Sequence, residues 1–372
     1  MTKREYIYTI VFVAVSLPLM YSCSDDSEAE GERVMVELQP CAQSFVEVSP
    51  ISTRAWTPPT GYYSYESMNN MFSGQTDLIN KTIGIFFTQD DKSPEEGRFF
   101  YGSDGKWRAT VQIKVATYYL YGFIPYESGV SASVSGTYSS GATLALNGLP
   151  TVTPSDVCVV VGAKNDTSED DDNELKTGQF EYKAASTSSD NFIFLLFDHL
   201  YSALNIKVSV GADYYALRRI KLKEMTLVPY SGGTVFSNKA NVTVTLASNT
   251  NGASPITGVT YAPTGSDDEP LPIFQSVDGQ ELQTTSTPIR GCFTPQGITK
   301  FILKSTYDVY DRKDNLIREG CTAENTIDMT KLFPSTTQMQ RGTMYTLNMT
   351  VEPTYLYVLS DPDLDNPTLV IE

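Results

Sequence analysis

The chain has 372 residues, with 27 Lys and Arg against 44 Asp and Glu, so its formal net charge is -17. Such an acidic chain repels the phosphates of nucleic acids and the headgroups of anionic membranes, which excludes both as partners of its surface. The length also exceeds what one small hydrophobic core needs and predicts more than one domain.

The first 22 residues have the features of a secretory signal peptide. Lys3 and Arg4 precede an apolar stretch at residues 7–20, which is shorter than the roughly 20 residues of a membrane-spanning helix. Cys23 follows directly after Ser22, and an acidic run comes next. The pattern predicts removal of residues 1–22 and lipidation of Cys23. The alternative is an ordinary signal peptide followed by an incidental cysteine.

Residues 23–54 form a candidate lipidated pro-segment that contains a removable strand. Apolar and polar residues alternate over residues 34–38, and a second apolar group follows before Pro50. Alternation with a period of two is typical of a strand with one buried face. The residues of this candidate removed strand are Val34, Val36, Leu38, Val46 and Val48.

Arg54 and Ala55 form a candidate site of proteolytic processing. Pro58, Pro59 and Gly61 follow and keep the chain irregular, and proteases require such accessible stretches. Loss of the strand upstream of Arg54 would expose a groove and an unpaired sheet edge, which another strand can fill. The alternative is a solvated arginine in a linker.

Residues 55–190 are expected to form an N-terminal β-sandwich domain. Its strands show either alternation with one apolar face or more continuous apolar runs, as expected of central strands. Asp104-Gly105 predicts a two-residue hairpin turn. The expected strands are residues 83–87, 109–115 and 118–124.

Residues 191–372 are expected to form a C-terminal β-sandwich domain. The polar, acidic stretch of residues 165–191 marks the boundary, and a second polar stretch at residues 249–272 predicts a surface excursion. Short helices are expected only at residues 214–222 and 330–333. The expected strands are residues 205–210, 242–246 and 345–351.

The C-terminal tail supplies a candidate donor strand. Apolar residues alternate with polar ones along it, with Pro353 as an interruption. Alternation does not say whether a strand enters its own domain or that of a neighbour, so both readings stay open. The residues of this candidate donor strand are Tyr345, Leu347, Met349, Val351, Tyr355 and Tyr357.

The sequence predicts no catalytic, cofactor-binding or metal-binding residues. The one histidine, His199, lies among apolar residues, which favours a hydrogen-bonded structural role near the core. Acidic residues at positions 361–365 imitate a calcium loop without its glycine and flanking helices, which favours a solvated turn. Cys158 is expected to be a small buried hydrophobe, and a bridge between Cys292 and Cys321 stays open.

Five segments of the chain occur in an order that is typical of one protein family. They are the lipoprotein start at Cys23, Ser52-Thr53-Arg54-Ala55, Ile83-Gly84-Ile85-Phe86, Tyr118-Tyr119-Leu120-Tyr121-Gly122-Phe123-Ile124-Pro125-Tyr126 and Phe197-Asp198-His199-Leu200. In this order they resemble the fimbrillins, the pilus subunits and fimbrillin-like surface lipoproteins of Bacteroidetes. The resemblance covers nearly the whole mature chain.

The resemblance implies both a fold and a way of assembly. Fimbrillins have two transthyretin-like antiparallel β-sandwich domains in tandem, in a mainly β fold. Stalk subunits are lipoprotein precursors that an extracellular arginine-specific protease cuts, which removes the first strand, and a C-terminal strand of a neighbouring subunit fills the gap. The implied partners are other fimbrillin-like subunits, lipoprotein-processing enzymes and that protease, with membrane contact only through the lipid.

We therefore expect a structural subunit of a surface fimbria that assembles by protease-triggered strand exchange and serves adhesion or biofilm formation. Its expected location is the outer membrane, lipid-anchored and surface-exposed, and the fimbrium after processing. The alternative is a monomeric outer-membrane lipoprotein that binds a glycan or a host ligand. An enzyme is not favoured, because no catalytic constellation stands out.

Overall fold

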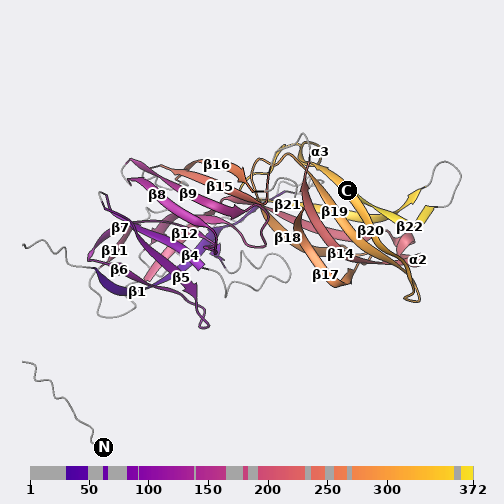
Figure 1. The fold of residues 1–372 in the computed structure, drawn as a ribbon, viewed down its shortest axis with the longest axis horizontal. Coiled ribbons are helices and arrows are strands. Elements are labelled where there is room, and N and C mark those ends of the chain that lie inside the picture. Colours follow the sequence, from indigo (N-terminus) through magenta and orange to yellow (C-terminus); the bar gives the residue numbers. More distant parts are fainter. Residues whose placement is uncertain are drawn as a thin grey trace, which may run out of the picture.

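The computed structural model describes residues 31–48, 62–65, 82–90, 92–137, 140–164, 179–182, 192–230, 236–247, 255–265, 270–355 and 362–371. These residues form a mainly β structure of four sheets with two short helices. The molecule is elongated, and its two hydrophobic cores lie one after the other along the long axis (Figure 1).

The first core is enclosed by a large mixed sheet and a smaller antiparallel sheet. Pairing of β10 with β7 closes the large sheet on itself. Its order is β10 (Cys158–Lys164), β12 (Phe192–His199), β1 (Glu32–Gln43), β6 (Trp107–Ile113), β5 (Glu95–Tyr101), β4 (Thr82–Thr88), β7 (Ala116–Ile124) and β11 (Gln179–Tyr182), with β3 (Tyr62–Ser64) on β1. The smaller sheet contains β16 (Ile256–Thr264), β15 (Lys239–Leu246), β9 (Gly141–Pro150) and β8 (Ser131–Thr137).

The second core is enclosed by the two remaining sheets and the helices at their ends. One sheet has the order β18 (Thr287–Pro295), β13 (Tyr201–Val210), β21 (Thr343–Tyr355) and β2 (Val46–Val48), with β22 (Pro362–Ile371) on β21. The other has the order β17 (Leu271–Glu281), β14 (Arg218–Pro229), β19 (Lys300–Asp311) and β20 (Leu316–Asp328). The helices are α2 (Ala212–Leu217) and α3 (Met329–Leu332).

Hydrophobic periodicity explains most of these strands. In β6 the buried residues alternate with polar ones, beginning with Trp107, while the central strand β4 is buried over five consecutive residues. The predicted strands at 83–87, 118–124, 205–210, 242–246 and 345–351 are confirmed as parts of β4, β7, β13, β15 and β21, and the one predicted at 109–115 is confirmed up to Ile113, where β6 ends. The predicted mainly β fold is therefore confirmed.

The hairpin that Asp104-Gly105 predicts is present, with a longer turn than expected. Strands β5 and β6 pair antiparallel next to it. The backbone N–H of Gly102 donates to the Lys106 carbonyl over 2.8 Å, and Gly105 has a positive φ of 80°. The connection therefore runs from Gly102 to Lys106, and glycine supplies its left-handed residue.

Three sequence expectations need correction. The expected helix at 214–222 ends at Leu217, because Arg218 already begins β14, whose apolar side chains alternate into the second core. The expected surface excursion at 249–272 contains β16, which pairs along β15. The expected acidic turn at 361–365 overlaps β22, which begins at Pro362. In each case a long-range strand pairing overrides a local polar or helical preference.

The chain crosses between the two cores more than once. Strand β12 pairs with β1 and β10 in the large sheet, and β15 pairs with β9, so residues beyond 191 complete the first core. The described strands thus do not separate into the two cores at residue 190. The division into residues 55–190 and 191–372 and the tandem transthyretin-like count stay predictions.

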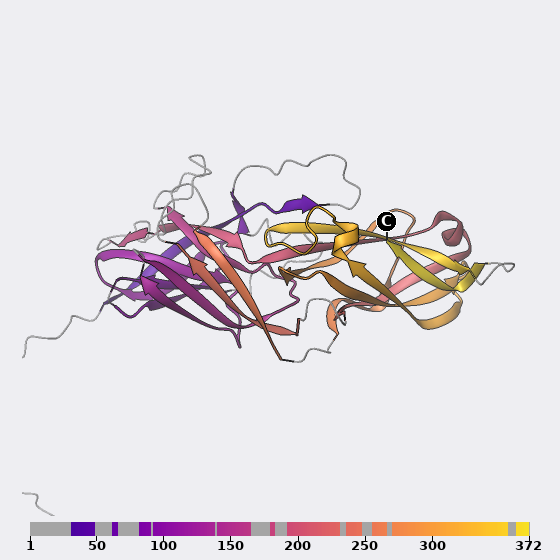
Figure 2. The ribbon, with the colours of Figure 1, turned by 90° about the horizontal axis from the view of Figure 1, so that it is seen from above.

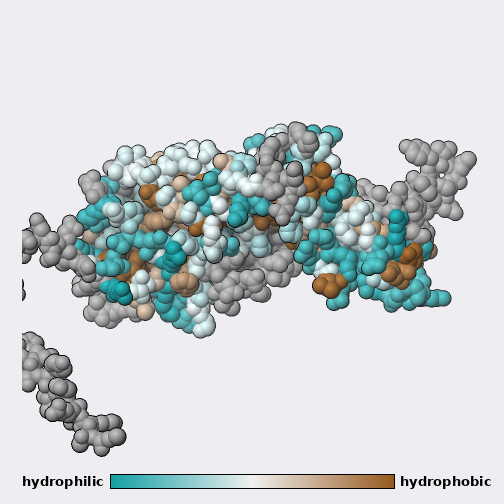
Figure 3. All heavy atoms as spheres, viewed as in Figure 1, coloured by the Kyte–Doolittle hydropathy of each residue, from teal (hydrophilic) through white to brown (hydrophobic). Residues whose placement is uncertain are grey.

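The exposed surface is mostly hydrophilic, with scattered apolar side chains (Figure 3). Among the described helices, neither has the length and apolar character that crossing a lipid bilayer requires.

Two glycines allow β4 and β7 to approach closely. In the register of this pair, Ile85 faces Gly122 and Gly84 faces Phe123. A Cβ atom at Gly122 would overlap the backbone oxygen of Gly84 and the Ile85 side chain. These glycines belong to the two motifs that the sequence analysis singled out, and the structure gives them a packing role.

We predict that Gly122→Ala lowers the free energy of unfolding by about 1–3 kcal/mol, because backbone atoms cannot rotate away from the added methyl group. Gly258→Ala in β16 is the matched control, since its Cβ would meet only Thr245 at ordinary contact distance, and its effect should stay within about 0.5 kcal/mol. Urea unfolding followed by tyrosine and tryptophan fluorescence measures both. Equal stabilities of the two variants would contradict the close approach.

Candidate functional site

The N-terminal segment, residues 31–48, lies along both halves of the molecule. Figure 2 shows this indigo segment running from the left half onto the orange and yellow half. Strand β1 belongs to the large sheet of the first core, and β2 pairs with β21 in the second core. The segment that the sequence analysis marks as removable therefore contributes to both cores.

Strand β1 has neighbours on both of its edges. On one edge it pairs antiparallel with β6 over Glu32–Leu38, and then with β3 over Cys41–Gln43. On the other edge it pairs parallel with β12 over Glu37–Ala42. Because β1 is an internal strand, its removal would leave unpaired backbone groups on β6 and β12 at once.

The burial of β1 follows the predicted alternation. Val34, Val36 and Leu38 are buried in the first core, with exposed fractions of 7%, 0% and 2%. Met35, on the opposite face, is 52% exposed. Glu37 is also on the outer side, where its carboxylate binds Lys106 and Arg108. The inward residues fill a groove that a strand of the same pattern could refill.

Phe45 lies between β1 and β2 and is buried in the first core. Its ring stacks on His199 with centroids 3.8 Å apart and lies 5.8 Å from the ring of Phe293. The next residue, Val46, donates its backbone N–H to the carbonyl of Gly342 over 2.9 Å. Val46 itself is exposed and Val48 is half-buried, so β2 is held mainly through its backbone and through Phe45.

Strand β21, the candidate donor, lies in the core of its own molecule. It pairs parallel with β13 along Ala203–Val210. Its other edge is shared, since β2 pairs at Thr343–Tyr345 and β22 pairs from Met349 to Tyr355. Four side chains of the candidate set are almost fully buried in the second core, namely Tyr345, Leu347, Met349 and Val351.

Several predicted site residues lie outside the described part of the chain. They are the lipidation site Cys23, the processing site Arg54–Ala55 and Tyr357. Tyr355 is described as the last residue of β21. The structure leaves the processing and lipidation predictions untested.

The four cysteines among the described residues form no disulfide bonds. Cys41, Cys158, Cys292 and Cys321 are all buried and unbridged, so the possible bridge between Cys292 and Cys321 is not formed here. Burial raises the pKa of the Cys292 thiol to about 12. Cys41 lies on β1 and therefore belongs to the candidate removable segment.

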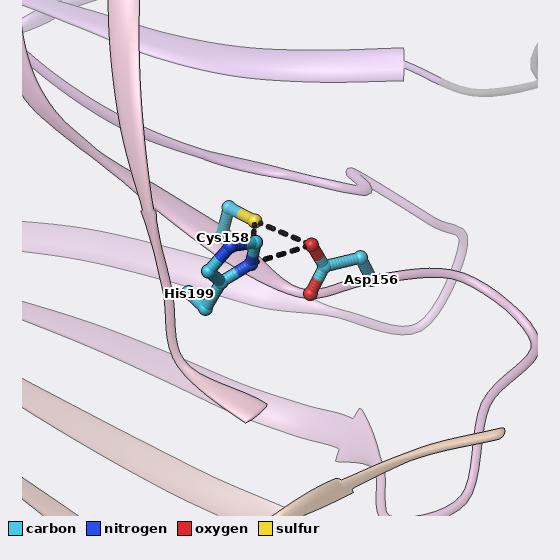
Figure 4. A group of neighbouring side chains, drawn as sticks. All are labelled: Asp156, Cys158 and His199. Atoms are coloured by element: carbon cyan, nitrogen blue, oxygen red, sulfur yellow. Dashed lines mark hydrogen bonds and ion pairs between the residues drawn. The ribbon is translucent and has the colours of Figure 1, made fainter. Parts of the chain in front are cut away.

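His199 forms a buried cluster with Asp156 and Cys158 (Figure 4). Its Nδ1 lies 2.7 Å from Asp156 Oδ2, and the Cys158 thiol donates to the same oxygen over 3.0 Å. Cys158 Sγ is also 3.4 Å from His199 Nδ1. Desolvation first, and then the nearby charge of Asp156, raise the pKa of the Cys158 thiol well above its usual range.

The predicted structural role of His199 is confirmed as far as its burial and hydrogen bonds go. The sequence analysis treated Cys158 as a plain hydrophobe and did not consider Asp156. Both residues contact His199 because Cys158 and His199 are directly paired across β10 and β12. No local pattern signals this pairing, since about forty residues separate the two strands.

A comparison with known proteins gives structural neighbours only. No protein-family model and no curated protein matches the chain. A fimbrial protein from Bacteroides vulgatus is similar with a TM-score of 0.33 and 12% identity, covering 91% of this chain and 98% of that chain. A candidate cell adhesion protein from Bacteroides fragilis has a TM-score of 0.41 and 10% identity, covering 92% and 97%.

The fimbrial anchor protein Mfa2 from Porphyromonas gingivalis is a further neighbour, with a TM-score of 0.23 and 9% identity over 90% of this chain and 95% of that chain. These structural neighbours are described as fimbrial and cell adhesion proteins.

We predict that Leu38→Ala lowers the free energy of unfolding of the uncut chain by about 2–5 kcal/mol, because it leaves a cavity where β1 packs on the core. Met35→Ala is the control on the same strand, and it should change stability by no more than about 0.5 kcal/mol because Met35 faces outward. Denaturant unfolding of both variants measures the difference. A Leu38 variant as stable as the Met35 variant would mean that β1 is not inserted.

Proposed function

We propose that this protein is a subunit of a surface fimbria, in which a strand of a second copy replaces β1 after proteolysis at Arg54. The observation that carries the proposal is the position of β1. It is an internal strand of the large sheet, and the candidate processing site lies between it and the strands with which it pairs. One cut therefore disconnects a core strand from the rest of the molecule.

The vacated groove would bind a replacement strand strongly. Val34, Val36, Leu38 and Phe45 are nearly fully buried, and side chains of this kind contribute roughly 2 kcal/mol each on burial. A strand with four such apolar side chains would regain about 8 kcal/mol as an upper bound, before the cost of ordering it, and a strand with two, such as Leu369 and Ile371 of β22, would regain about half of that. Backbone pairing to β6 and β12 adds to this, which supports a long-lived polymer.

The uncut chain is protected from early assembly. In the precursor β1 belongs to the same molecule as the groove, so it occupies the groove without paying the entropy of association. An incoming strand cannot compete until the cut makes the segment a separate peptide. Processing at the cell surface would in this way confine polymerisation to the place where the fimbria grows.

We assign the donor role to β22 in place of β21. Donation of β21 would strip Tyr345, Leu347 and Met349 from the donor's own second core, where they are buried, and would break its long pairing with β13. Strand β22 pairs only with β21 among the described strands and ends the described chain. Its departure would break no other pairing among the described strands.

The remaining parts of the proposal follow from the sequence. A lipid on Cys23 would hold the precursor on the outer membrane, facing outward, until the cut releases residues 23–54. The partners are then other fimbrillin-like subunits, lipoprotein-processing enzymes and an arginine-specific protease, and the biological role is adhesion or biofilm formation.

The second candidate function is a monomeric surface lipoprotein that binds a glycan or a host ligand. An open hollow of about 560 Å³ on the outer face of the large sheet favours it, because exposed Phe100 and Met35 lie beside Arg98 and Arg108 there. The arginines already bind acidic side chains, Arg98 with Glu96 and Arg108 with Glu37 and Asp104, so the hollow has little free positive charge.

We predict that an arginine-specific protease converts the purified precursor into a ladder of polymers on a denaturing gel run without boiling, with an N-terminus at Ala55. Arg54→Lys keeps the charge and should prevent both the cut and the ladder. Retention of a single band after complete cutting, together with binding to a glycan column, would instead favour the monomeric binder.

The reactivity of the Cys41 thiol measures whether the segment that contains β1 is released after the cut. This thiol is buried on β1 in the uncut chain, and it should react with a maleimide once the segment leaves the groove. Cys321 is buried in the second core and serves as the unreactive control. Cutting at Arg54 without a change at Cys41 would show that the segment stays in place and that the groove does not open.

We predict that a chain ending at residue 360, which lacks β22, forms no ladder after cutting, because it can accept a strand but cannot donate one. Mixed with the intact protein, it should shorten the ladder by capping growing polymers. Gel analysis of mixtures at several ratios measures the effect, with unfolding curves to check that the truncated chain folds. A normal ladder from the truncated chain alone would refute donation by β22.

A further inference from the structure

We propose that Asp156, Cys158 and His199 form a binding site for a divalent transition-metal cation of the zinc class. The site is distinct from the strand-exchange groove and its test does not depend on assembly. A thiol, an imidazole and a carboxylate converge on one point in Figure 4, and all three residues are buried, with exposed fractions of 0–1%.

The backbone positions of the three residues are fixed by the fold. Cys158 and His199 are directly paired across β10 and β12, and Asp156 lies two residues before Cys158. The Tyr65 hydroxyl donates to the backbone carbonyl of Asp156 over 2.7 Å. Arg341 donates to the carbonyl of His199 over 3.2 Å. Ligands held by packed strands and by such contacts lose little freedom when a metal binds.

The separations of the donor atoms match a tetrahedral centre closely. Zn–N and Zn–O bonds of about 2.1 Å and a Zn–S bond of about 2.3 Å place the ligand atoms about 3.4–3.6 Å apart at tetrahedral angles. In the structure the atoms are 2.7, 3.0 and 3.4 Å apart. A metal ion therefore needs only sub-ångström shifts, chiefly of the Asp156 oxygen that now accepts both hydrogen bonds.

Charge and ligand softness select the cation. A thiolate, a carboxylate and a neutral imidazole together balance two positive charges, so the filled site is neutral, as burial requires. The thiol proton leaves to solvent when sulfur binds the metal, and the imidazole proton moves to the other ring nitrogen, so that Nδ1 becomes a ligand. Sulfur favours zinc, cobalt or copper over calcium and magnesium. Water or the second Asp156 oxygen fills the fourth position.

Phe45 covers the site. Its ring stacks on the His199 imidazole at 3.8 Å and is itself only 3% exposed. A metal ion must therefore enter while the chain folds, or when residues 44–46 lift from the surface. Because Phe45 lies in the N-terminal segment, access to the site is coupled to the position of that segment.

The test uses cobalt as a spectroscopic probe and the full uncut chain. Refolding with Co²⁺ should yield about one bound ion per chain, with the sulfur-to-cobalt charge-transfer band that only a thiolate ligand produces. Cys158→Ala should lose this band. Cys292→Ala, which removes another buried thiol, should keep it. A folded wild-type chain without the band, or a band that persists in Cys158→Ala, would overturn the proposal and leave only a hydrogen-bonded cluster.

The blocking of the site by the Phe45 ring has a separate test. Phe45→Ala should take up Co²⁺ in the folded state at least about tenfold faster than the wild type, because the stacked ring no longer blocks His199. Met35→Ala is the control in the same segment. Equal uptake rates in the wild type, Phe45→Ala and Met35→Ala would show that Phe45 does not block the site. The existence of the metal site is tested separately, by the charge-transfer band of the refolded protein.

Discussion

The insertion of β1 between β6 and β12 is the interaction on which the rest of the structure depends. It places Val34, Val36 and Leu38 in the first core and satisfies the backbone of both neighbouring strands. The strand lies upstream of the candidate processing site at Arg54, so a cut there would separate it from the strands with which it pairs.

The same segment connects the two cores. After β1, Phe45 packs on His199 and Phe293, and β2 then pairs with the start of β21. The edge of β21 that β2 occupies continues into the part occupied by β22. Strands β2 and β22 therefore lie on one edge of β21, where the departure of either strand leaves backbone groups that another strand can pair with.

The Asp156, Cys158 and His199 cluster lies where these elements meet. Asp198, beside it, accepts a hydrogen bond from Arg341, which comes from the loop before β21. The cluster thus joins β10 and β12 of the first core to the second core and lies beneath the ring of Phe45. Buried polar groups at such a junction form their hydrogen bonds only when the surrounding strands are in one relative position. The cluster therefore helps to specify how the strands of the two cores pack on each other.

The sequence by itself determined the mainly β fold and the inward face of each regular strand, because alternation with a period of two is a local property. Val34, Val36 and Leu38 could be assigned to a core on that ground alone. Tertiary structure decided that β1 is an internal strand, that β21 lies in the second core and that residues 256–264 form β16. It also brought Asp156 and Cys158 to His199. These outcomes depend on which strands pair, and pairing between distant segments is chosen by the packing of the whole core, which no local pattern records.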